Sequence, residues 1–178
     1  MEPPANASQQ FNLEREHVLR TVERNGGLNL FSKKFSDDKE IVLAAVRHSG
    51  AELNYASPRL QNDKDVVLAA VKRSGIALMY ASKELQADRD VALQALIDLP
   101  SSLEYTSNEL RSDVKFMEEA MNHHPLAFYF SLSLDGVLIE LVYKSKDKDL
   151  IEVAEKRLRR SSHTESESEI SFGDLLSI

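Results

Sequence analysis

The sequence predicts an all-α solenoid of about five 25-residue two-helix units, followed by capping helices and a disordered acidic tail. The main observation is a repeat. The segment 38–46, which reads Asp-Lys-Glu-Ile-Val-Leu-Ala-Ala-Val, returns in near-identical form as 63–71, and looser copies begin at Asp88 and Asp113. A fixed period of this length is typical of stacked supersecondary units and not of one closed globule.

Four regions are expected along the chain: a disordered N-terminus (1–12), helical repeats (13–136), capping helices (137–160) and a disordered Ser/Glu tail (161–178). The N-terminal stretch is polar, holds two prolines and lacks the apolar core of a classical signal peptide. The tail is small, polar and acidic, so it cannot bury enough apolar surface to become ordered.

The first part of each unit is predicted to be an α-helix of about three turns. It opens with Asp-x-Asp/Glu, whose carboxylates suit the N-terminal N–H groups, and closes with a basic or polar pair followed by Gly or Pro. We expect Gly50 and Gly75 to end their helices in the left-handed conformation. The run between these signals is apolar nearly all round, which predicts burial against neighbouring helices.

The second part of each unit has the pattern Leu-x-Tyr-Ala/Thr-Ser-x-x-Leu, which predicts a shorter and partly 3₁₀ helix. Its tyrosine recurs at one repeat position, where it could form a stacking platform for a ligand or peptide. A periodic aromatic is more often part of the core, with its hydroxyl at the edge. We therefore expect the tyrosines to pack toward the adjacent unit. They are Tyr55, Tyr80 and Tyr105.

These two patterns together resemble a family of short helical repeats that is classed only as a domain of unknown function. Residues 36–111 resemble it well, and residues 13–35 and 112–136 weakly. The family is seen in protists and in secreted effectors of intracellular bacteria. The resemblance therefore implies a helical repeat and brings no activity or functional residue with it.

Composition argues against several functional classes. The chain carries a net charge of −7, of which the tail contributes −4, so the body is a poor polyanion binder and we expect no nucleic-acid partner. Its longest apolar run is far shorter than a bilayer span, so we expect no transmembrane segment. There is no cysteine and no nucleophile elbow, phosphate-binding loop or dinucleotide fingerprint. The sequence thus predicts a protein that is not an enzyme and holds no cofactor.

Two groups of ionisable residues resemble catalytic or metal-binding sites. Acid pairs such as Asp63/Asp65 resemble catalytic or metal-binding carboxylates, but they recur from unit to unit, as helix caps do and catalytic pairs do not. His123-His124 could form a metal pair, although an exposed position at a helix end is the favoured interpretation. We predict no metal site.

The candidate binding residues of the repeats are cations at the ends of the long helices. They vary between units while the core positions do not, which favours contact with a protein partner. They are Arg47, His48, Lys72 and Arg73.

The tail ends in an apolar segment, whose candidate binding residues are Phe172, Leu175 and Leu176. Its glutamate block, followed by a hydrophobic residue three or four from the end, resembles the C-terminal signals of type IV-secreted bacterial effectors. That resemblance implies contact with the secretion machinery and delivery into the host cell cytoplasm. Alternatively, Phe172-Gly173-Asp174-Leu175 resembles the aromatic-x-x-aliphatic motif bound by ubiquitin-like autophagy proteins, which would suit a cytoplasmic scaffold or adaptor. In a third interpretation the tail is only a solubilising end that docks on the cap.

Overall fold

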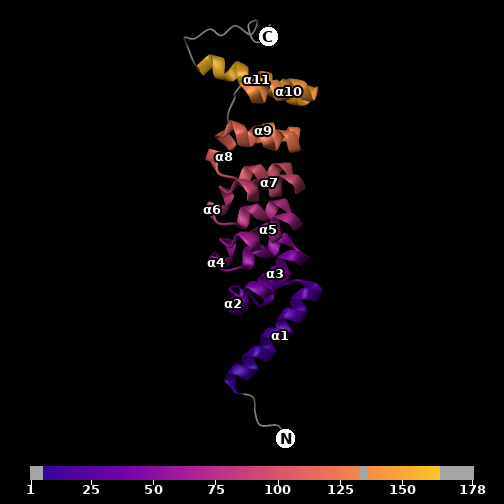
Figure 1. Ribbon diagram of the computed structural model, residues 1–178, viewed down its shortest axis with the longest axis vertical. Coiled ribbons are helices and arrows are strands. Elements are labelled where there is room, and N and C mark those ends of the chain that lie inside the picture. The colour runs from indigo at the N-terminus through magenta and orange to yellow at the C-terminus, as the bar shows by residue number, and fades with distance from the viewer. Residues whose placement is uncertain (1–5, 133–135, 165–178) are drawn as a thin grey trace.

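The computed structural model describes residues 6–132 and 136–164 and confirms the all-α solenoid (Figure 1). Within these ranges every regular element is a helix. The elements form a column with α1 at one end and the pair α10–α11 at the other.

Each unit contains a long α-helix, a 3₁₀ helix and, in the first four units, a short α-helix. The second part of the unit, predicted as one short helix, thus consists of two helices in these units. The long helices are α1 (Ala7–Asn25), α3 (Lys39–His48), α5 (Lys64–Arg73), α7 (Arg89–Asp98) and α9 (Val114–His123). The 3₁₀ helices are η1 (Leu28–Leu30), η2 (Gly50–Tyr55), η3 (Gly75–Tyr80), η4 (Pro100–Tyr105) and η5 (Pro125–Phe130). The short helices are α2 (Ser32–Phe35), α4 (Pro58–Gln61), α6 (Lys83–Gln86) and α8 (Asn108–Ser112).

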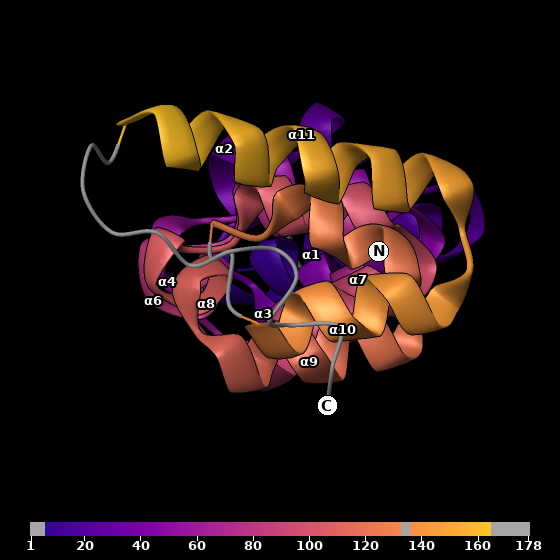
Figure 2. The ribbon, with the colours of Figure 1, turned by 90° about the horizontal axis from the view of Figure 1, so that it is seen from above.

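Like elements stack on like elements from one unit to the next. The helices α3, α5 and α7 pack in sequence, and η2, η3 and η4 do the same. Seen along the column, α4, α6 and α8 lie behind one another on one side (Figure 2). The solenoid therefore has a long-helix layer, a 3₁₀ layer and a short-helix layer.

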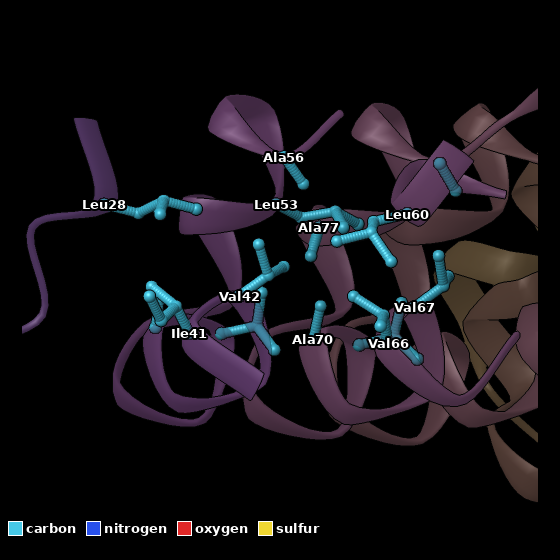
Figure 3. Close-up of a cluster of buried hydrophobic side chains, with 14 of the residues drawn as sticks. Leu28, Ile41, Val42, Leu53, Ala56, Leu60, Val66, Val67, Ala70 and Ala77 are labelled. Carbon is cyan, nitrogen blue, oxygen red and sulfur yellow. The ribbon is translucent and has the colours of Figure 1, made fainter. Parts of the chain in front are cut away.

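The core lies between the long-helix layer and the 3₁₀ layer. In α5 the pairs Val66-Val67 and Ala70-Val71 are fully buried, and so is Leu78 of η3 in the 3₁₀ layer. Figure 3 shows the same arrangement one unit earlier, where Val42 of α3 points toward Leu53. Tyr80 and Tyr105 are partly buried and pack against this cluster, as predicted, whereas Tyr55 is 40% exposed.

Acidic caps start the long helices of the second to fifth units, as the sequence predicted. The side chain of Asp63 accepts hydrogen bonds from the N–H groups of Asp65 (3.1 Å) and Val66 (3.3 Å), two of the donors that the first turn of a helix leaves unpaired. The equivalent N-cap residues are Asp38, Asp88 and Asp113.

A backbone hydrogen bond joins successive units at the short-helix layer. The N–H of Ser82 donates to the carbonyl of Gln61 at 2.9 Å, and Ser82 also caps α6 through its side chain. Each such bond crosses from one unit to the next, so it adds to the stacking interface. The equivalent bonds run from Ser57 to Ser36, from Ser107 to Gln86 and from Leu132 to Arg111.

The prediction for Gly50 and Gly75 was wrong. Neither glycine has a positive φ. Each begins a 3₁₀ helix and packs against the long helix of the next unit. A Cβ at Gly50 would lie 2.5 Å from the carbonyl oxygen of Ala70, and one at Gly75 would lie 2.4 Å from that of Ala95. Close packing between units, and not a left-handed turn, is the reason for glycine at these positions.

The left-handed glycines are instead in the first unit, where the turn is one residue shorter than in the later units. Gly26 and Gly27 have φ values of 68° and 84°. The carboxylate of Glu52 from the next unit accepts hydrogen bonds from the N–H groups of Gly27 (3.2 Å) and Leu28 (2.9 Å). This contact holds the shortened turn against η2.

The first helix begins earlier than the sequence suggested. Residues 1–12 were expected to be disordered, but α1 starts at Ala7, because Asn6 and Gln9 form a capping box. Helices α10 (Gly136–Ser145) and α11 (Lys148–Thr164) close the other end, the former against α9 and the latter against η5.

Candidate functional site

A ladder of ion pairs runs along the N-terminal ends of the long helices. The ammonium group of Lys39 lies 2.8 Å from the carboxylate of Asp63 and 3.1 Å from that of Asp65. One unit later, Lys64 lies 2.8 Å from both Asp88 and Asp90. Since the same contact recurs from unit to unit, these carboxylates join neighbouring units and do not form a single reactive centre.

Their pKa values follow from these contacts. Burial alone would raise the pKa of Asp63, but the hydrogen bond from Lys39 and those from the N–H groups of Val66 and Asp65 outweigh it, so that the pKa falls below 3.8. The pKa of Asp88 is lowered for the same reasons, with Lys64 as the donor. These carboxylates are therefore ionised at neutral pH.

The ladder ends at α9. Arg89 occupies the position of Lys39 and Lys64, but the residue equivalent to Asp65 is Lys115. The guanidinium of Arg89 therefore reaches Glu119 at 2.5 Å and lies 5.5 Å from the ring centre of Phe116. A change of charge at one repeat position thus redirects the contact.

A shallow groove of about 440 Å³ lies on the outer face of the long-helix layer, between α3 and α5. Leu68 and Ala69 form its apolar part, and Asp65 stands at the end nearest the start of α5. At the other end lie the cations Arg47, Lys72 and Arg73. The groove therefore offers apolar surface between an acidic and a basic end.

The four predicted binding residues of the repeats separate into two pairs. Arg47 and Lys72 are exposed, and within the described residues neither side chain has a hydrogen bond or ion-pair partner. Arg73 instead donates from Nε to the carbonyl of His48 at 3.2 Å, so it also joins neighbouring units. The ring of His48 lies over Gly26, at which a Cβ would stand 2.6 Å from the imidazole Cδ2. Three of the four residues line the groove, while His48 lies beside the turn of the first unit.

Sequence reasoning missed the groove residues Asp65, Leu68 and Ala69. The sequence did contain a signal for the groove. The residue equivalent to Ala69 is Ala44 in α3, but it is Gln94 in α7 and Glu119 in α9. The side chain at this position is thus small in α3 and α5, which flank the groove, and long in the next two helices.

A second hollow, of about 290 Å³, lies at the N-terminal end of the solenoid. Its cation Lys34 pairs with Glu14 and lies 5.4 Å from the ring centre of Phe11 and 5.6 Å from that of Phe35. Lys33 also lines this hollow and is exposed, but the hollow is smaller and Lys34 is paired within the chain, so it is the weaker candidate for a partner.

The remaining predictions concern the tail, metal ions and membranes. Phe172, Leu175 and Leu176 lie outside the described residues. In the described part of the chain, no group of three or more His, Asp or Glu side chains could hold a metal ion. None of the helices in that part is long and apolar enough to cross a membrane.

Comparison with known proteins identifies the repeat. The family described as "Domain of unknown function (DUF4116)" matches residues 15–60, 38–86 and 88–134, together well over half of the chain. Each matched segment spans about two of the stacked units. No curated protein and no solved structure is significantly similar to the chain. The chain therefore belongs to the DUF4116 family, a short repeat family whose function is unknown.

Proposed function

We propose that this protein is a non-catalytic protein-binding module that presents the outer face of α3 and α5 to a partner. The observation that carries the proposal is the groove between these helices. Arg47 and Lys72 stand beside it without partners among the described residues, whereas the cations of the ion-pair ladder are paired. A protein surface with acidic and apolar groups would supply what these side chains lack.

The distribution of ionisable groups favours binding over catalysis. Catalytic sites bring perturbed acids and bases together in one cleft. Here the capping carboxylates with lowered pKa values, those of Asp38, Asp63 and Asp88, are spread along the column, one per unit, and each is held by a lysine or arginine of the preceding unit. An arrangement of this kind supports stacking.

The finer proposal is that the protein is a bacterial effector, delivered into the host cell cytoplasm by a type IV secretion system. Its support is the composition of residues 161–178, where a glutamate block precedes Leu175 and Leu176. The resemblance of the repeat to proteins of that class points the same way. The repeats would then hold a host protein, and the tail would engage the secretion machinery.

A translocation assay tests the delivery step. A reporter fused to the full chain, and the same fusion lacking residues 161–178, would be expressed in a type IV-competent bacterium in contact with host cells. We expect delivery that depends on the tail. Absence of delivery in both forms would contradict the effector proposal and favour a cytoplasmic scaffold or adaptor that uses the Phe172–Leu175 motif. Binding of a peptide of residues 165–178 to a ubiquitin-like autophagy protein, with Phe172→Ala as control, would test that alternative.

Site-specific crosslinking tests the groove itself. With a photoreactive residue at Lys72, the chain added to host cytosol should crosslink to a protein partner, and with the same residue at Lys156, an exposed position in α11, it should not. Equal capture at both positions would contradict a binding role for the groove.

A further inference from the structure

The outer faces of α3 and α5 each carry the same three rows of side chains. In α5, Asp65, Leu68, Ala69 and Lys72 are spaced i, i+3, i+4 and i+7, so they share one face of the helix. The equivalent residues of α3 are Glu40, Leu43, Ala44 and Arg47. The two helices pack against each other, so the rows run across both. An apolar row thus lies between an acidic edge and a basic edge.

The acidic edge keeps its negative charge despite the ion-pair ladder. Each of the ladder cations Arg15, Lys39 and Lys64 lies between two carboxylates, as Lys39 does between Asp63 and Asp65. One cation and two carboxylates together carry a net charge of −1. The side chains of the outer acids remain largely exposed, 63% for Glu40 and 81% for Asp65. These carboxylates face solvent, so each can also pair with a cation of a binding partner.

The basic edge has no such compensation close by. Arg47 and Lys72 have no ion pair among the described residues, and Arg73 donates to a backbone carbonyl, which leaves its charge unpaired. The next acid along this edge, Asp98, accepts a hydrogen bond from the N–H of Gly75 at 2.7 Å. One edge of the face is therefore negative and the other positive.

From this pattern we infer that the partner of the groove is a second copy of this chain, packed face to face with its helices antiparallel. The two-fold axis runs along the stacking direction, over the apolar row. Glu40 and Asp65 of each copy then lie opposite Arg47 and Lys72 of the other, and the leucines meet at the axis. Two-fold interfaces require a surface that is complementary to itself, and this face meets that requirement.

Two further observations favour this occupant. Antiparallel packing sets the positive N-terminal end of each helix dipole against the negative C-terminal end of its neighbour. The alanines at positions 44 and 69 leave room for close approach of the two helix layers. This inference rests on the proposed function, because it names the partner for the same groove.

The pattern also marks the limits of the interface. In α1 the alanine and basic positions hold Arg20 and Glu23, and in α9 the leucine and alanine positions hold Glu118 and Glu119. Neither helix continues the three rows. In α7 the acid and leucine persist as Asp90 and Leu93, so this helix would lie at the rim. Because the solenoids run in the same direction, the dimer places both α11 helices at one end.

Sedimentation of the purified full chain over a concentration series tests the dimer. We expect a monomer–dimer equilibrium that weakens with added salt. The variant Arg47→Glu/Lys72→Glu makes both edges acidic and should weaken the dimer by at least about 100-fold, because like charges would oppose one another. The variant Glu40→Lys/Asp65→Lys makes both edges basic and should weaken it similarly. An equimolar mixture of the two variants should restore association, since every opposed pair is again of opposite sign.

Two controls separate this result from damage to the fold. Lys156→Glu reverses one charge in α11, away from the groove, and should leave the equilibrium unchanged. Ala69→Gln copies the residue that α7 already has at this position, so the unit tolerates it, and it should fill the groove and weaken the dimer. A wild-type chain that stays monomeric, or an Arg47→Glu/Lys72→Glu variant that dimerises as well as wild type, would overturn the inference.

The crosslinker at Lys72 distinguishes this inference from the proposed function. A product of two copies of this chain supports both. A product with a different protein, together with a monomeric chain in sedimentation, overturns the inference and leaves the binding module standing. If neither crosslinked product forms, the result contradicts both the inference and the proposed function.

Discussion

The ammonium group of Lys64 lies 2.8 Å from the carboxylate of Asp88, which is the N-cap of the next long helix. One carboxylate thus does two things: it pairs the first N–H groups of α7 and it joins α7 to the preceding unit. The same arrangement links Arg15 with Asp38 and Lys39 with Asp63. In a solenoid each unit contacts only its neighbours, so such contacts contribute directly to the interfaces on which stability depends.

Removal of the cap should cost more than removal of its charge. Asp88→Ala loses both hydrogen bonds to the N–H groups of Asp90 and Val91, and we expect it to lower the free energy of unfolding by about 1–2 kcal/mol. Asp88→Asn retains the capping oxygen and loses only the charge pair with Lys64, so it should cost less. Urea unfolding measures both. Equal losses would show that the ion pair dominates and the cap contributes little.

Acid should weaken the contacts between units. The folded state lowers the pKa of Asp63 and Asp88 below 3.8, because hydrogen bonds from lysine and from the backbone outweigh the effect of burial. A lowered folded pKa means that the contribution is complete above about pH 3.8 and is lost as the pH falls through the folded value. Unfolding of wild type and of Lys39→Met/Lys64→Met should therefore differ at neutral pH, and the difference should disappear as the pH falls through the lowered folded pKa values of these carboxylates. A difference that persisted in acid would contradict this account.

Two glycine substitutions should have opposite effects. Gly75→Ala places a methyl group 2.4 Å from the carbonyl oxygen of Ala95, so the units must move apart, and we expect a loss of about 1–3 kcal/mol. Gly136→Ala meets nothing within 4 Å at the start of α10. It should be neutral or stabilise by at most about 1 kcal/mol, because alanine favours the helix. Thermal unfolding of the pair measures the difference, and similar values for both would rule out the steric explanation.

Arg157 should hold the C-terminal cap to the last unit. Its guanidinium donates to the carbonyls of Phe128 (3.0 Å) and Ser131 (2.5 Å) and lies 5.0 Å from the ring centre of Phe128. Burial lowers its pKa without discharging it. Arg157→Leu removes both of these hydrogen bonds from a charged donor, which should cost about 1–3 kcal/mol and speed hydrogen exchange in α11 and η5. The control variant Arg20→Leu removes a surface pair with Glu16 in α1 and should change stability by less than about 0.5 kcal/mol.

The sequence alone predicted the elements whose cause is local. The repeated Asp at the N-cap and the Leu-x-Tyr-Ala/Thr-Ser pattern act within a few residues of themselves, so their structure follows from their chemistry. The near-continuous apolar run also predicted that the repeat helices α3, α5 and α7 pack against their neighbours. For these reasons the unit, its period and the all-α class could be predicted from the amino-acid sequence.

Contacts between units could be decided only by the tertiary structure. Glycine at position 75 looked like a left-handed helix end, but its reason is the carbonyl oxygen of Ala95 in the next unit of the stack. Arg73 looked like a free cation, but it donates to the backbone of the preceding unit. The groove depends on the small side chain of Ala69, and in the sequence an alanine at this position indicates only a residue that favours helix. In each case the deciding atom lies in another unit, and no local pattern specifies how closely two units approach.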